Sequence, residues 1–190
     1  EHAHLQVMAG ERLERVARQD AAECEVERER QHVGGRLLRQ ARAVGAVSGN
    51  HEDFDTGLQH EAALMHTAAA AQQTPPLHLL DCTQVLIDGV RFLGCTLWTD
   101  FELRIDTAEG PRSDRARGIA TAQQAMADYR SIGWHECGAP RRLVPYDTLR
   151  LHQQQRAWLQ LRLAEPYDGP TVVITHHGPH PLSVHPRYVG

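Results

Sequence analysis

Two short apolar segments, each followed at once by a tight polar loop, constrain this 190-residue chain more than any other feature. The first is Val44 to Val47, which enters Ser48-Gly49-Asn50-His51-Glu52, and the second is Thr171 to Thr175, which enters His176-His177-Gly178-Pro179. Short runs rich in β-branched and other apolar residues favour strands, and Gly or Pro directly after a run favours a turn. The pattern therefore predicts two strands, the second of them buried, whose ends present amide or imidazole groups.

The rest of the chain predicts a mixed α/β protein that is large enough for one domain with a sizeable core. Asp88-Gly89 lies between two apolar runs and predicts a tight hairpin, because Gly tolerates a positive φ. A helix over 146–164 should bury a stripe made by Leu149, His152, Arg156, Leu159 and Leu163. The other expected elements are helices over 58–73 and 114–129, strands over 77–80, 85–87 and 90–97, and loops over 100–113 and 133–145.

Residues 1–46 differ from the rest of the chain. Glu11 to Arg42 is dense in Arg, Glu and Gln with only scattered apolar residues, so any helix there has a poor apolar stripe. We expect this charged segment to be disordered or translated in the wrong reading frame, with a peripheral helix as the alternative. Residues 47–190 are then the folded domain.

Composition narrows the function classes. The formal net charge is −4, so no general attraction to nucleic acid is expected. No apolar run approaches the length of a membrane span, so no membrane partner is expected. The four cysteines lie apart in sequence without a C-x-x-C pair, which is typical of buried or idle thiols in a reducing cytoplasm.

The two loops carry the residue types that bind divalent metals. The side-chain oxygen of Asn50 is a neutral hard ligand, and the adjacent His51 can donate a proton or hydrogen bond to a phosphoryl oxygen. Neighbouring His residues on an extended chain point to opposite sides, so only one of His176 and His177 should face a given metal. The alternatives are a β-turn with Asn50 in a left-handed conformation and a pair of exposed histidines.

Taken as an ordered set, these motifs resemble signature blocks of the calcineurin-like metallophosphoesterases. Gly49-Asn50-His51-Glu52 resembles that family's Gly-Asn-His-Asp/Glu block, and Thr175-His176-His177-Gly178-Pro179 resembles a later His block. Three further stretches resemble a bacterial, uncharacterised branch of the family: Leu93 to Phe101, Met126 to Arg130, and Ser183 to Tyr188. The resemblance covers residues 47–190.

The resemblance implies a fold and an activity. The fold would be a partial four-layer αββα sandwich. The activity would be hydrolysis of a phosphate mono- or diester in a small phosphorylated substrate. The nucleophile would be a hydroxide activated by two divalent ions (Mn, Fe or Zn).

The resemblance also implies roles for residues of the two main loops. Asn50 would be a metal ligand and His51 the catalytic group that meets the leaving group. Glu52 would support the loop and orient His51. In the family the ligating His commonly lies two residues before a Pro, which selects His177, with His176 as the open alternative.

Four residues outside the two loops have weaker assignments. Trp98 and Asp100 are candidates for substrate binding or for support of the ligands, against a plainer interpretation as core or rim packing and as a cap or solvated group. Phe101 and Asp128 have the same two interpretations.

Other blocks of the family are not found. Asp-x-His, Gly-Asp and Gly-His-x-His are absent, although His2-Ala3-His4 and Met8-Ala9-Gly10-Glu11 partly echo the first two. We therefore expect a sequence incomplete at both ends that binds metal weakly and turns over little substrate. The alternatives are an inactive fragment or binding remnant of the same fold, and an unrelated helical interaction protein.

Overall fold

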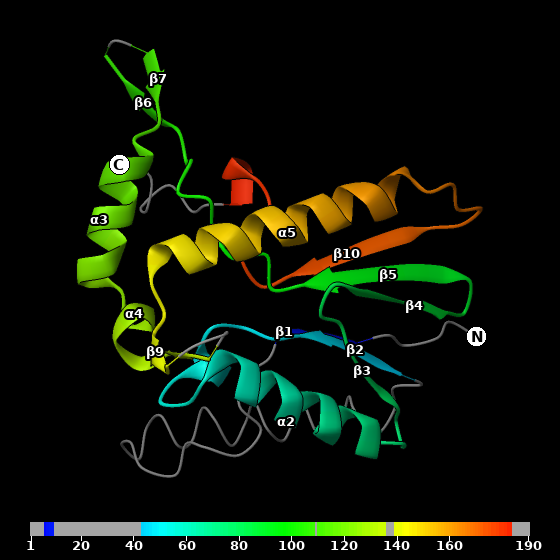
Figure 1. The fold of residues 1–190 in the computed structure, drawn as a ribbon. Helices are drawn as coiled ribbons and strands as arrows, with labels where there is room; N and C mark the ends of the chain where they lie inside the picture. Colours follow the sequence, from blue (N-terminus) through cyan, green and yellow to red (C-terminus); the bar gives the residue numbers. More distant parts are fainter. Residues whose placement is uncertain (1–5, 10–42, 109, 136–138, 184–190) are drawn as a thin grey trace, which may run out of the picture.

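A computed structural model describes residues 6–9, 43–108, 110–135 and 139–183, and its strands form two main sheets (Figure 1). The first sheet is parallel, with the strand order β1-β2-β3. The second sheet has the order β10-β5-β4, in which β10 runs parallel to the central strand β5 and β4 runs antiparallel to it. The bounds are β1 (Gln6–Ala9), β2 (Val44–Val47), β3 (Leu77–Leu79), β4 (Thr83–Ile87), β5 (Val90–Cys95) and β10 (Thr171–Thr175).

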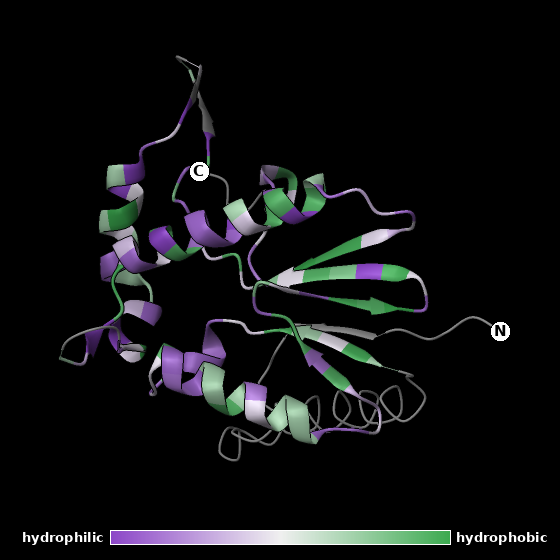
Figure 2. Ribbon diagram, turned by 45° about the vertical axis from the view of Figure 1, so that its right-hand side comes forward, coloured by the Kyte–Doolittle hydropathy of each residue, from purple (hydrophilic) through white to green (hydrophobic). Residues whose placement is uncertain are grey.

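The two sheets lie between two helices, so the described chain forms four layers. Helix α2 (Leu58–Ala71) covers the outer side of the first sheet and α5 (Pro145–Ala164) that of the second (Figure 1). Apolar residues run along the strands between these helices (Figure 2). Between the sheets the core consists of Val47, Leu80, Phe92 and Ile174. The mixed α/β class predicted from the sequence is confirmed at this level.

The hairpin predicted at Asp88-Gly89 is confirmed. Both residues have positive φ, 49° and 78°, as a two-residue turn with the twist of the flanking strands requires. Ile87 and Val90 form the closing pair of the β4–β5 ladder.

Three segments differ from the expected pattern. The loop expected over 100–113 contains a hairpin of β6 (Ile105–Thr107) and β7 (Gly110–Arg112), and the one over 133–145 contains the pair β8 (Gly133–Trp134) and β9 (Arg141–Arg142). The helix over 114–129 is instead two helices, α3 (Arg115–Ala125) and α4 (Asp128–Ser131). The Asp114 side chain caps α3 by accepting from the Arg117 N–H at 3.0 Å, and Met126, with ψ of 137°, ends it.

The N-terminal segment holds a strand that the sequence pattern did not predict. Strand β1 pairs with β2 in parallel, from Gln6 opposite Val44 to Ala9 opposite Val47. Ala43 and Val44 are buried, so the expected boundary between residues 46 and 47 falls inside a core strand. The expectations for residues 2–4, for 10–42 and for 184–188 lie outside the described residues.

Burial on α5 and β10 corrects two predictions. On α5 the side chains of Thr148, Gln155 and Leu159 are buried, while Arg156 and Leu163 of the expected stripe are exposed. On β10 only Ile174 is buried, because β10 is the edge strand of the described sheet. Two short 3-10 helices lie at the candidate loops: η1 (His51–Asp53) begins within the first loop, and η2 (Pro181–Ser183) follows the second. Among the described residues no helix is long and apolar enough to cross a membrane.

Candidate metal centre

The two candidate loops meet where β2 and β10 end. The Asn50 side-chain oxygen Oδ1 lies 2.9 Å from Nε2 of His176, across 126 residues of sequence. The other end of the same carboxamide, Nδ2, donates to Oδ1 of Asp128 at 2.6 Å. Asp128 is buried at the start of α4. Since a carboxylate only accepts hydrogen bonds, Asp128 fixes the carboxamide with its oxygen toward His176.

Gly49 and Glu52 shape the loop from behind. The Gly49 N–H donates to Oε2 of Glu52 at 2.7 Å, and Glu52 is only 3% exposed. Burial raises the pKa of Glu52, and its other oxygen, Oε1, is buried without a hydrogen-bond partner among the described residues. A Cβ on Gly49 would lie 2.6 Å from Cε1 of His176, so no larger residue fits without displacing that ring.

His176, not the preferred His177, faces Asn50. The two rings do not point to opposite sides as expected for an extended chain, because both residues lie in a bend after β10 and their rings meet edge to face with centroids 5.0 Å apart. The backbone N–H of His177 donates to the Thr96 carbonyl oxygen at 3.0 Å, and its Nδ1 lies 3.2 Å from the same oxygen. Its ring stacks on Trp98 with centroids 5.3 Å apart. Burial lowers the pKa of His177, which keeps the imidazole neutral.

His51 is exposed beside Asn50, at the start of η1. Its ring stacks on Phe54 with centroids 4.6 Å apart. The hydrogen bond of Glu52 to Gly49 agrees with the expected support of the loop, whereas the orientation of His51 comes from Phe54. Asp53, the last residue of η1, is 4% exposed, and burial raises its pKa to about 8.

The two remaining candidates lie behind and beside this cluster. Trp98 is 5% exposed and belongs to a core cluster, so it supports His177 rather than offering a surface to substrate. Asp100 is half-buried: its Oδ1 accepts from the Glu102 N–H at 2.9 Å, and its Oδ2 lies 3.6 Å from Nε2 of His152. His152, on α5, also contacts the carbonyl oxygens of Leu97 and Trp98 through Nδ1, at 3.3 and 3.2 Å.

The donors at this site fit a hard divalent cation in kind but not in number. Two ligand atoms bound at about 2.1 Å and at a right angle lie about 3.0 Å apart, close to the separation of Asn50 Oδ1 and His176 Nε2. The unpartnered oxygen of Glu52 is a further buried acceptor in the same loop. Yet within the described ranges no group of three or more His, Cys, Asp or Glu residues is arranged to hold a metal ion. The described residues thus supply two candidate ligand atoms and one further buried acceptor.

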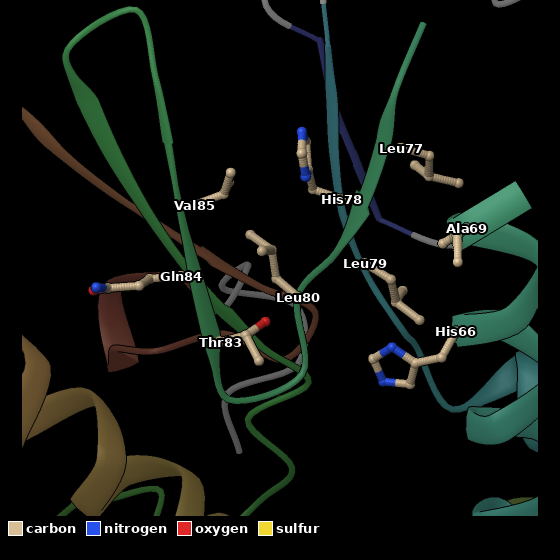
Figure 3. Close-up of a pocket in the computed structure, with 10 residues that line it drawn as sticks. His66, Ala69, Leu77, His78, Leu79, Leu80, Thr83, Gln84 and Val85 are labelled. Atoms are coloured by element: carbon tan, nitrogen blue, oxygen red, sulfur yellow. The ribbon is translucent and has the colours of Figure 1, made fainter. Parts of the chain in front are cut away.

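Two hollows of the described surface lie away from these residues. One of about 290 Å³ lies between α2, β3 and β4, with His66, Leu79 and Thr83 among its lining residues (Figure 3). A second is lined by residues around Gly57 and Arg142. Neither lining includes Asn50, His51, His176 or His177.

Asp128, expected to be a cap or a solvated group, is instead buried and accepts a hydrogen bond from Asn50. An Asp at the start of a short helix is typical of a cap, so the sequence contains no sign of another role. Only the fold brings its carboxylate to Asn50. Comparison of the chain with protein-family models, with curated proteins and with solved structures finds no match.

Proposed function

We propose that this chain belongs to a metal-dependent phosphoesterase that hydrolyses a phosphate mono- or diester in a small phosphorylated substrate, in the cytoplasm. The single observation that carries the proposal is the 2.9 Å approach of the Asn50 carboxamide oxygen to His176 Nε2 at the ends of two strands. The four described layers are compatible with the αββα sandwich of calcineurin-like metallophosphoesterases, and we propose that architecture for the complete domain.

Asn50 and His176 would hold one divalent ion (Mn, Fe or Zn), since those metals accept mixed oxygen and nitrogen ligands. When bound, a pair of such ions lowers the pKa of water and neutralises charge on the phosphoryl oxygens. Asp128 holds the carboxamide oxygen toward His176. For Nε2 of His176 to bind a cation, the ring proton must sit on Nδ1.

His51 would donate a proton to the leaving oxygen. Its ring is exposed next to the candidate ligand Asn50, and Phe54 restrains it by stacking. Imidazole is the side chain that most often transfers protons in catalysis. His177, neutral and bound to the Thr96 carbonyl, would support the loop or complete the ligand set.

Two protein donors make a weak site, because affinity for a hard cation grows with the number and charge of its ligands. We therefore propose weak metal binding and slow turnover for this chain. The second candidate function is a non-catalytic remnant of the same fold, and it is favoured by the lack of a three-ligand cluster among the described residues.

The test is hydrolysis of bis(p-nitrophenyl) phosphate and p-nitrophenyl phosphate in the presence of Mn²⁺, with bound metal measured on the same samples. His51→Ala should lower kcat by about 100-fold or more while leaving metal content unchanged. Asn50→Ala should lower metal content as well. If His51→Ala removes the metal and leaves turnover per metal intact, the assignment is wrong. If the parent chain shows no Mn²⁺-dependent turnover, the remnant is the better conclusion.

A further inference from the structure

Two cysteines that lie apart in sequence meet on the α5 side of the second sheet. Thr83 and Gly94 form the last pair of the β4–β5 ladder, and the next residues along the two strands are Cys82 and Cys95. Cys95 is fully buried and Cys82 partly so, and both belong to a cluster with Leu93, Leu97 and Leu159 beneath α5.

The two thiols lie close enough to share a hydrogen bond. In a two-residue hairpin the closing pair, here Ile87 and Val90, is hydrogen-bonded, and hydrogen-bonded and non-hydrogen-bonded pairs then alternate along the ladder. Cys82 and Cys95 lie one position beyond the last pair of the ladder, Thr83 and Gly94. In a regular ladder this position is a non-hydrogen-bonded pair, whose Cα atoms lie about 4.5 Å apart. That separation is within the range of about 4.4–6.8 Å seen for disulfides. A φ of 48° at Cys82 turns the chain just as it enters β4.

The two sulfur atoms also differ in reactivity. A hydrogen bond from the Cys95 thiol lowers the pKa of Cys82, while that same bond and burial raise the pKa of Cys95. The thiolate is the nucleophile in thiol–disulfide exchange. The more accessible Cys82 is therefore the attacking group and the buried Cys95 the resolving group.

We propose that Cys82 and Cys95 form a reactive dithiol that low-molecular-weight disulfides, such as oxidised glutathione, convert to an intramolecular disulfide. In the first step the Cys82 thiolate attacks one glutathione sulfur, forms a mixed disulfide and releases one glutathione thiolate. In the second step Cys95 gives up its proton and attacks Cys82 Sγ, and the second glutathione leaves as its thiolate and takes that proton. The protein dithiol is oxidised by two electrons, and one oxidised glutathione becomes two reduced molecules.

The bond would lie next to the candidate metal centre. Cys95 precedes Thr96, whose carbonyl oxygen accepts the His177 N–H at 3.0 Å. Oxidation would tie the start of β4 to the strand end that holds the His176-His177 loop. The dithiol does not depend on the proposed function, because its evidence comes from the β4–β5 hairpin alone.

The experiment uses the full chain with Cys24→Ser and Cys137→Ser, which leaves only the two thiols in question. After incubation with oxidised glutathione, intact mass should show loss of two hydrogen atoms, and both thiols should be lost to alkylation. Arg91 is the only trypsin site between the two cysteines. Without reductant, the tryptic peptides 43–91 and 92–104 should therefore appear as one linked species.

Two matched variants test the order of the steps. Cys95→Ser should stop at a glutathione adduct on Cys82, whereas Cys82→Ser should leave Cys95 unmodified. Circular dichroism checks that each variant is folded. In the chain that carries only Cys24→Ser and Cys137→Ser, the proposal is overturned if both remaining thiols stay alkylatable. It is also overturned if a glutathione adduct persists on Cys82 while Cys95 stays free. That chain thus decides the result even if a variant fails to fold.

Discussion

Gly49→Ala gives the sharpest test of how the candidate metal centre is packed. The added Cβ would lie 2.6 Å from Cε1 and 2.8 Å from Nδ1 of His176, and 2.9 Å from Oε2 of Glu52. Since carbon atoms rest about 3.5 Å apart, the imidazole must withdraw by about 0.9 Å. A displacement of this size is large enough to break the 2.9 Å contact between His176 Nε2 and Asn50 Oδ1.

Overpacking of this size costs about 1–3 kcal/mol of unfolding free energy. It should also weaken divalent-cation affinity by about tenfold or more, as the loss of a ligand-orienting contact does. The matched control is Gly45→Ala in β2, whose Cβ would meet Ile174 Cδ1 at 3.5 Å, an ordinary contact. That change should leave cation affinity unaltered.

The assays are urea unfolding followed by circular dichroism and titration with Mn²⁺ followed by electron paramagnetic resonance. Equal stability and equal affinity in the two variants would refute the packing argument. If Gly49→Ala loses stability but binds Mn²⁺ with unchanged affinity, the packing argument stands and the assignment of His176 as a ligand is refuted.

Three further predictions concern buried charges and thiols. Asp128→Ala frees the Asn50 carboxamide and should weaken Mn²⁺ binding by about 10–100-fold. Asp128→Asn retains a hydrogen-bond acceptor for Asn50 and should weaken Mn²⁺ binding less. Burial raises the pKa of Asp53 from 3.8 to about 8, so the folded state favours the protonated carboxyl. The contribution of Asp53 to the unfolding free energy is therefore complete below pH 3.8 and is lost as pH rises through about 8. Asp53→Asn should therefore flatten the fall in urea midpoint over that window, and parallel pH profiles would contradict this. Oxidation of Cys82 and Cys95, which closes a loop of 14 residues counting both ends, should raise the unfolding free energy by ~3 kcal/mol in urea melts, and an unchanged midpoint would exclude an unstrained disulfide.

Local sequence determined the elements whose signals are short-range. The Asp88-Gly89 hairpin, the strand Val44–Val47 and the long helix starting near Pro145 follow from turn chemistry and apolar runs. Strand β1 escaped prediction because a short strand in a charged segment is defined by its partner β2 rather than by its own residues. The β6–β7 hairpin escaped for the same reason: pairing across a loop compensates for residues with little strand preference of their own.

The site divides in the same way. By itself the sequence determined that an amide and imidazoles would follow strand ends, because the apolar runs lead directly into loops that carry these residues. Only the tertiary structure decided that His176 rather than His177 faces Asn50, that Asp128 holds the carboxamide, and that Cys82 meets Cys95. These outcomes depend on strand register and on which side of the chain each residue faces. Both are set by long-range hydrogen bonding and core packing that no local stretch of residues encodes.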